Sequence, residues 1–254
     1  RHYITALAKM FSKAGWDIAA WNNRTCNGPI NRTIKLYHHA ASYDIRTVVD
    51  YAIETYGYDE ICLAGISMGG GQTLRYMGQG DEFPLPEQVK KAVAISAPCF
   101  LPESAETLYS PSNRIYEQRF LKKLIGKIKA KAAQFPEIDI EGIDQLKTLK
   151  EFDNRYSGPL NGFENADGFY EYCNPYPFMA NIDRPTLIIN ALNDPLLKGR
   201  CYPYEMIEAN EHLFLETPKR GGHVGFAMWG SEFTYSEKRT FDFLNKSLEQ
   251  FQGR

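Results

Sequence analysis

Apolar residues along the chain follow two patterns that predict two kinds of element. Short apolar runs of strand length lie at 16–21, 60–66, 89–96, 185–192 and 212–217. Apolar residues at helical spacing mark the segments 41–56, 68–77 and 236–251, the last with Ser236 as its predicted N-cap. Strands that alternate with helices need crossover connections. The pattern therefore predicts an α/β fold, with a mostly parallel sheet and helices on both faces.

The alternation stops between about residues 98 and 181, in a stretch that is too long for one crossover and lacks strand patterns. We interpret residues 99–180 as a helical cap inserted into a core formed by 1–98 and 181–254. A basic segment at 113–135 is predicted to be a helix with one face on the core and a solvated charged face. The alternative, an amphipathic helix that contacts an anionic lipid surface, is less favoured.

Aromatic side chains are dense in this predicted cap and have two interpretations. They line a pocket for an acyl chain, or they form the hydrophobic core of the insertion, and the sequence does not separate the two. The residues concerned are Tyr116, Phe152, Tyr156, Phe163 and Tyr170.

Composition narrows the class of protein. The 254 residues are 43% hydrophobic and 24% charged, as in a globular domain, and the net charge of −2 argues against a nucleic-acid partner. No apolar run approaches the roughly 20 residues that span a bilayer, and no secretory signal is visible. The five cysteines lack metal-ligand spacing, and reduced thiols favour a cytoplasmic location. Because a helical pattern begins at Arg1, we expect the natural N-terminus and the first strands of the fold to be missing.

The strongest local motif is the pentapeptide Gly-Ile-Ser-Met-Gly at 65–69. It follows an apolar run and precedes a helical segment, which is the context of a nucleophile elbow, where a serine occupies a sharp strand-to-helix turn. Crowding at such a turn predicts glycine on both sides, at Gly65 and Gly69. The helix N-terminus also points N–H groups toward negative charge that forms near the serine. We therefore predict Ser67 as a nucleophile.

A serine hydroxyl needs an adjacent base, and His223 fits that role best. In folds with this elbow the histidine follows the last strand, and the acid follows an earlier one. His223 lies after the last predicted strand in a Gly-Gly-His-Val-Gly-Phe loop, whereas His2, His38 and His39 precede the serine. Asp194 is the only carboxylate in the loop after the preceding strand, and we predict that it fixes the tautomer of His223.

One oxyanion-hole donor is predicted, the backbone N–H of Met68. The second donor normally comes from a loop ahead of the first helix, a position that would precede Arg1. A missing donor costs about 2.7–4 kcal/mol of transition-state stabilisation. We therefore expect this chain by itself to turn over esters very slowly although its triad is complete.

Several segments together resemble the YheT-like hydrolases, also called the AB hydrolase 4 family of the α/β-hydrolase superfamily. They are Asn-Asn-Arg-Thr-Cys-Asn-Gly at 22–28, Tyr-His at 37–38, the serine motif through residue 70, Ala-Ile-Ser-Ala-Pro-Cys at 94–99, Phe-Asp-Asn-Arg-Tyr at 152–156, Asn-Gly-Phe at 161–163 and the loop at 221–226. The resemblance implies an α/β-hydrolase fold with a cap, action on carboxylic esters, and a triad of Ser67, Asp194 and His223. The chain departs at Asn193 and Thr25, where the family usually has aspartate and glycine, and it lacks the family's His-Gly segment before the first helix.

We expect a serine hydrolase that cleaves lipid-like or short- to medium-chain acyl esters through an acyl-enzyme, with no metal and no organic cofactor. An acyltransferase or thioesterase would use the same residues with another acceptor, and a non-catalytic acyl-binding or lipid-binding protein would keep only the scaffold. The expected partner is a small-molecule ester. Substrate-binding residues and oligomeric state are not predicted.

Overall fold

Four parallel strands form the sheet at the centre of the molecule. The computed structural model describes residues 2–80 and 83–252, and within them the strands are β1 (Ile61–Ile66), β2 (Val89–Ile95), β3 (Thr186–Ile189) and β4 (Leu213–Glu216). They pair in chain order, and the register joins Ile66 to Ile95, Ile95 to Ile189 and Ile189 to Glu216. The strands therefore end at one common edge, where the loops that follow them meet. The predicted parallel sheet is confirmed.

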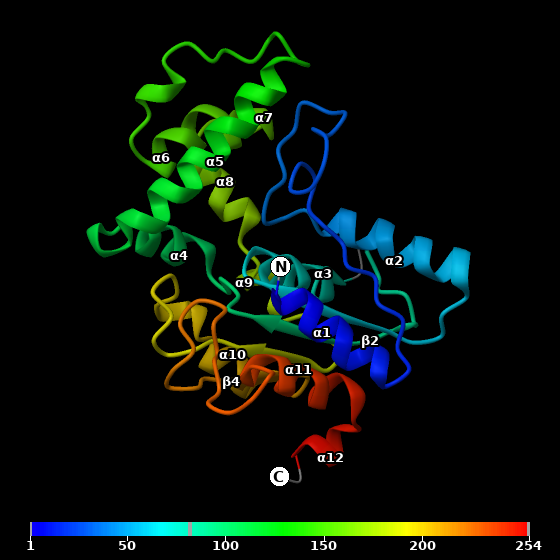
Figure 1. Ribbon diagram of the computed structural model, residues 1–254. Coiled ribbons are helices and arrows are strands. Elements are labelled where there is room, and N and C mark those ends of the chain that lie inside the picture. The colour runs from blue at the N-terminus through cyan, green and yellow to red at the C-terminus, as the bar shows by residue number, and fades with distance from the viewer. Residues whose placement is uncertain (1, 81–82, 253–254) are drawn as a thin grey trace.

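Helices cover both faces of this sheet (Figure 1). One face packs against α2 (Ser42–Tyr56), α3 (Met68–Met77), α9 (Tyr176–Met179) and α10 (Tyr204–Ala209), and the other against α1 (His2–Lys13), α11 (Tyr235–Asn245) and α12 (Leu248–Gln252). Side chains alternate along the strands, so that Ala94 and Ile188 point to the first face while Ile95 and Ile189 point to the second. Apolar residues on both faces are what a fully covered parallel sheet requires.

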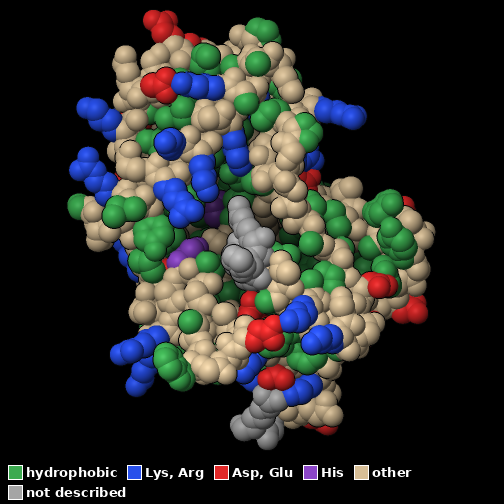
Figure 2. All heavy atoms as spheres, in the orientation of Figure 1, with side chains coloured by type: hydrophobic (Ala, Val, Ile, Leu, Met, Phe, Trp, Pro, Cys, Tyr) green, Lys and Arg blue, Asp and Glu red, His purple; other side chains and the backbone are tan. Residues whose placement is uncertain are grey.

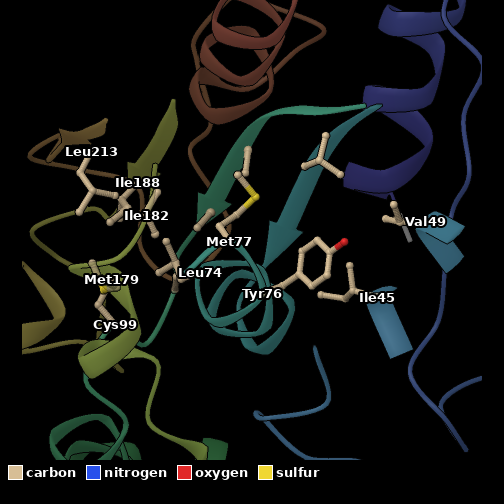
Figure 3. Packing of buried hydrophobic residues seen from close by; sticks show 14 residues of the cluster. Ile45, Val49, Leu74, Tyr76, Met77, Cys99, Met179, Ile182, Ile188 and Leu213 are labelled. Atoms are coloured by element: carbon tan, nitrogen blue, oxygen red, sulfur yellow. The ribbon is translucent and has the colours of Figure 1, made fainter. Parts of the chain in front are cut away.

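Helix α3 is enclosed by apolar neighbours, as Figure 3 shows for Leu74, Tyr76 and Met77. These three side chains are at most 1% exposed. At the first turn of the helix, a Cβ on Gly70 would lie 2.8 Å from the Cβ of Ala97, so only glycine permits this close approach to the chain that leaves β2. Burying a side chain such as Leu74 contributes about 1.5–3 kcal/mol. This packing fixes the position of α3, and with it the residue that precedes the helix.

Between β2 and β3 the chain forms a largely helical segment that lies above the sheet in Figure 1. Its helices are α4 (Leu101–Leu108), α5 (Arg114–Ala132), α6 (Leu149–Phe152), α7 (Gly158–Leu160) and α8 (Ala166–Cys173), with 3₁₀ turns at Pro111–Asn113 and Ile143–Gln145. Leu121 and Ile128 of α5 pack with Leu149, Phe152 and Tyr156 in a hydrophobic cluster of their own. The helix predicted at 113–135 is thus confirmed as α5.

The basic residues of α5 are in part bonded within the protein. The ammonium group of Lys131 donates a hydrogen bond to Oδ1 of Asn31 at 2.8 Å, and that of Lys127 donates to the hydroxyl of Tyr37 at 3.0 Å. Both contacts join α5 to the long loop that precedes α2. These two lysines therefore have structural partners, and the lipid-binding interpretation of the helix stays an untested prediction.

The Phe-Asp-Asn-Arg-Tyr segment joins two helices of the same region. Its last four residues begin a π-helical turn, Asp153–Ser157, which follows α6 directly. The hydroxyl of Tyr170 in α8 donates to Oδ2 of Asp153 at 2.6 Å, and the backbone N–H of Ala166 donates to Oδ1 of Asn154 at 2.8 Å. Burial raises the pKa of Asp153. The polar side chains of this segment therefore hold α6 and α8 together.

The strand predicted at 16–21 is wrong. The segment follows α1 but pairs with no other strand of the described chain, and Ile18 and Trp21 are 42% and 37% exposed. An extended segment becomes a strand only when a neighbour supplies ladder hydrogen bonds, and apolar composition alone does not provide one.

The C-terminal helix also differs from its prediction. Its N-cap is Thr234 rather than Ser236, because Thr234 and Glu237 exchange side-chain-to-backbone hydrogen bonds in a capping box. The predicted single helix is interrupted at Lys246, whose backbone is extended, so that α12 folds back and Phe251 packs against Phe243 with ring centroids 5.0 Å apart. No helix in residues 2–80 and 83–252 has the length and apolar character needed to cross a bilayer.

Candidate active site

Ser67 occupies the sharp turn between β1 and α3. Its backbone has φ 55° and ψ −120°, a region that non-glycine residues rarely adopt, and its N–H donates to the carbonyl of Ile95 at 2.8 Å. A Cβ on Gly65 would lie 2.2 Å from the carbonyl oxygen of Gly69 and 2.4 Å from Oγ1 of Thr73. Glycine is therefore required at 65, and the predicted elbow is present.

The prediction that crowding also demands glycine at 69 is wrong. A Cβ added to Gly69 meets no atom of the described chain within 4 Å outside the helix itself. The backbone of Gly69 lies against Gly65, but the position that a Cβ would take on Gly69, in the first turn of α3, is open.

His223 reaches the serine from the loop that follows β4. Its Nε2 lies 2.9 Å from Oγ of Ser67. The loop is tightly wound, with positive φ at Gly222, Val224 and Phe226. The ring of Phe226 is 1% exposed, and it packs so closely that a Cβ on Gly221 would lie 2.5 Å from it. The buried phenylalanine thus anchors the loop that presents the imidazole.

Asp194 contacts the other side of the imidazole. Its Oδ2 and Oδ1 lie 2.9 and 3.1 Å from Nδ1 of His223, and its side chain is completely buried, while that of His223 is 13% exposed. The N–H of Leu196 donates to Oδ1 at 2.9 Å and helps to hold the carboxylate. A carboxylate at Nδ1 favours the tautomer with the proton on that nitrogen, which leaves Nε2 free to accept from Ser67.

The four residues that sequence analysis selected thus meet at the carboxyl edge of the sheet. Ser67, His223 and Asp194 form a continuous hydrogen-bonded chain. Met68 is the first residue of α3, so the helix has no carbonyl four residues earlier to accept its N–H. This N–H is therefore available to an anion beside Ser67. In this geometry His223 can take the proton of the Ser67 hydroxyl. The N–H of Met68 can donate one hydrogen bond to an oxyanion that forms when the serine attacks a carbonyl group.

Three polar residues that the sequence analysis did not select support these loops. Asn190 is fully buried after β3, and its side chain both accepts from the N–H of Ala97 and donates to the carbonyl of Cys201 at 2.8 Å. Asn193 and Ser96 bond the backbone on either side of His223. For Ser96 and Asn190 the available signal was their position directly after β2 and β3, where a buried polar residue needs a loop partner, whereas Asn193 is exposed in the loop beyond β3 and gave no such signal.

Two of the remaining histidines, His38 and His39, are enclosed by the protein and are not part of the contacts between Ser67, His223 and Asp194. The N–H of Ala40 donates to Nδ1 of His38 at 3.2 Å, and the hydroxyl of Tyr43 lies 3.5 Å from Nε2. Burial lowers the pKa of His38 and of His39 to about 4. The side chain of His2 lies outside the described residues.

The five cysteines are unpaired. Burial raises the pKa of Cys62 and of Cys173 to about 12, which favours the inert thiol over the reactive thiolate. These two thiols are therefore poor competitors to Ser67 as a nucleophile.

Figure 2 shows histidine side chains in a hollow between the upper helical segment and the sheet. Lysine and arginine side chains gather on the helical side of this hollow.

The chain is similar to known proteins over almost its whole length. The family model described as "alpha/beta hydrolase fold" matches residues 2–227. Phospholipase ABHD3 of Homo sapiens is 25% identical over 97% of this chain and 61% of that protein, and the putative esterase YheT of Escherichia coli strain K12 is 26% identical over 97% of this chain and 73% of that protein. Monoacylglycerol lipase of Saccharomyces cerevisiae is 24% identical over 88% of this chain and 51% of that protein. The chain therefore spans about 60% of the phospholipase and half of the yeast lipase.

Solved structures share the same fold. The esterase Pf2001 of Pyrococcus furiosus superposes with a TM-score of 0.60 at 16% identity, over 96% of this chain and 75% of that one. A single-residue mutant of the meta-cleavage product hydrolase CumD superposes with a TM-score of 0.56 at 16% identity, over 97% of this chain and 84% of that one.

Proposed function

The chain belongs to the α/β-hydrolase fold family, as its resemblance to YheT-like hydrolases predicted. From this membership and from the site, we propose that it is a serine hydrolase that cleaves carboxylic esters through an acyl-enzyme. The observation that carries the proposal is the chain of contacts from Ser67 through His223 to the buried Asp194, with 2.9 Å between neighbouring polar atoms at both links. A strained serine whose hydroxyl contacts a base, with an acid on the far side of that base to orient it, is the arrangement that activates a hydroxyl.

The proposed reaction has two halves. Oγ of Ser67 attacks the ester carbonyl while Nε2 of His223 takes its proton, and the imidazolium then gives that proton to the leaving alcohol. Asp194 holds the imidazole and stabilises its charged form. A water molecule next attacks the acyl-enzyme by the same route and releases the carboxylic acid. The N–H of Met68 donates to the oxyanion in both halves.

The proposed substrates are lipid-like or short- to medium-chain acyl esters. The relatives named as a phospholipase and as a monoacylglycerol lipase support lipid-like esters for this chain. We propose that residues 99–180 act as a cap, because helices α4 to α8 lie beside the hollow that contains the histidines.

Labelling with a fluorophosphonate probe tests this proposal directly. The probe should modify Ser67 of the parent chain, and Ser67→Ala should remove the labelling. Ser104→Ala is a matched control, because Ser104 bonds the carbonyl of Leu196 and lies outside the proposed triad. Equal labelling of the parent and of Ser67→Ala would refute the assignment. Because a missing oxyanion donor slows the reaction by roughly a hundredfold to a thousandfold, the incubation is extended accordingly. Absence of labelling in a folded parent chain under those conditions would refute hydrolysis by an activated serine.

A panel of p-nitrophenyl esters then defines the acyl preference. Turnover should rise with acyl length from acetate toward medium chains if the substrates are lipid-like. A strict preference for acetate would contradict that part of the proposal while leaving the serine mechanism intact.

A further inference from the structure

The loop that carries His223 is held by one polar side chain on each side of the histidine. Oδ1 of Asn193 accepts the N–H groups of Gly221 and Gly222 at 2.8 and 2.9 Å, and Oγ of Ser96 accepts the N–H of Val224 at 3.1 Å. We propose that Asn193 and Ser96 are positioning residues that fix the imidazole of His223 between the nucleophile and the acid. This inference rests on the proposed function of the triad.

Asn193 couples the acid to the base through neighbouring atoms. It directly precedes Asp194, so one dipeptide bonds both the backbone before His223 and the ring of His223 itself. If the loop moved relative to Asp194, these backbone bonds would break together with the bond to the ring. Because Gly222 has φ 55°, its N–H belongs to a tight turn and not to a regular ladder, and the asparagine supplies the acceptor.

Ser96 supplies the second anchor from the neighbouring strand. It is fully buried at the end of β2, with φ 47°, and its N–H donates to the carbonyl of Ile189 at 2.9 Å. A serine held in this unusual conformation aims its hydroxyl at the loop beyond the sheet. The segments that follow the two central strands, β2 and β3, therefore each provide one hydrogen-bond acceptor to the loop that follows β4.

The anchor at 193 is uncharged, and this has a measurable consequence. The groups in contact with the imidazole are the hydroxyl of Ser67 and the carboxylate of Asp194. Asn193→Asp keeps an oxygen in place for both N–H groups but adds a negative charge one residue from that carboxylate. The added charge would favour the imidazolium and move the titration of His223 to higher pH, so the base would become active only at higher pH.

Four variants separate positioning from general stability. Asn193→Ala and Ser96→Ala each remove one anchor, and Asn193→Asp restores the acceptor with a charge. Asn210→Asp is the control. Oδ1 of Asn210 accepts the N–H of His212 at 2.9 Å before β4, at the opposite edge of the sheet, and its Nδ2 donates to the carbonyl of Ile182 at 2.9 Å, a bond that aspartate removes. For each variant we would measure fluorophosphonate labelling of Ser67 against pH, the thermal midpoint, and the titration of His223 by NMR, with His223→Ala to assign its signals.

Asn193→Ala and Ser96→Ala should each slow labelling by roughly tenfold, a loss comparable to one or two hydrogen bonds. Asn193→Asp should label faster than Asn193→Ala at high pH, and both its pH profile and the titration of His223 should move upward. Asn210→Asp should lower the thermal midpoint without moving the titration of His223.

Labelling of Asn193→Ala and Ser96→Ala at the parental rate would overturn the inference. So would an equal slowing by Asn210→Asp, because general destabilisation would then explain the effect. If the parent chain itself is not labelled, the proposed function fails. The NMR signals of the His223 ring still decide the positioning role in that case: ring signals of Asn193→Ala and Ser96→Ala that coincide with those of the parent reject it, and signals displaced in both variants but not in Asn210→Asp support it.

Discussion

The carboxylate of Asp194 is completely buried and lies 2.9 Å from Nδ1 of His223. Because this pairing sets which nitrogen carries the proton, Asp194→Asn should do more than remove a charge. The amide group can donate to Nδ1 and so favour the tautomer whose Nε2 is already protonated and cannot accept from Ser67. We expect the rates of probe labelling and ester turnover to fall by a factor on the order of 10⁴ while the fold is retained.

Asp183→Asn provides the comparison for that variant. Asp183 is largely exposed, pairs with Arg184 and lies before β3, at the other end of the strand that leads to Asp194. Its replacement should leave the labelling rate within about twofold, as expected for an exposed surface substitution. If Asp194→Asn kept more than a tenth of the parental rate, the orienting role assigned to this carboxylate would be wrong.

The two glycines that flank Ser67 should respond differently to alanine. Gly65→Ala introduces a Cβ that would meet the backbone oxygen of Gly69 at 2.2 Å, so the elbow must distort or the protein must lose stability by several kcal/mol. Gly69→Ala places its Cβ in open space within a helix and should stabilise the fold by about 0.5–1 kcal/mol. Urea unfolding of the two variants, followed by circular dichroism, measures both effects. Equal destabilisation by both substitutions would contradict the geometry of the turn.

The aromatic residues of the helical segment should separate into core and surface. Phe152 is fully buried in the cluster around α5 and α6, so Phe152→Ala should lower the free energy of unfolding by about 3–5 kcal/mol. Tyr116 is 40% exposed, and Tyr116→Ala should change that free energy by less than about 0.5 kcal/mol. A Phe152→Ala variant of parental stability but altered acyl-length preference would instead favour the pocket interpretation.

The sequence pattern predicted helices and strands best where the conformation of a segment depends mainly on the residues of that segment. The apolar run before Ser67, the helical spacing after it and the four strands at the common edge are all local signals, and each is present in the fold. The order of Ser67, Asp194 and His223 along the chain then sufficed to bring them to one edge, because parallel strands in sequence order place their following loops side by side.

The failures occurred where a structure depends on distant partners. The segment 16–21 has strand composition, but no described strand lies beside it. The roles of Ser96 and Asn193 depend on hydrogen bonds to residues 128 and 28 positions away, and no local pattern encodes such a pairing. Similarly, only the tertiary structure shows that a Cβ fits at Gly69 and not at Gly65.

The histidine pair at 38 and 39 should make stability depend on pH. Burial lowers the pKa of each to about 4 from an ordinary value of 6.5, so the unfolded chain binds protons there that the folded chain does not. Stability from the neutral rings is present above about pH 6.5 and is lost as the pH falls toward 4. Each histidine should cost about 1.5 kcal/mol between pH 6.5 and pH 5.

Urea unfolding at those two pH values checks this dependence. The double variant His38→Gln, His39→Gln should show a smaller loss of unfolding free energy on acidification than the parent, by about 3 kcal/mol. The variant is less stable than the parent at pH 7 because buried packing changes, and the comparison therefore uses the difference between the two pH values within each protein. A loss of the same size in both proteins would mean that neither histidine is held neutral by burial and that carboxyl groups control the acid response.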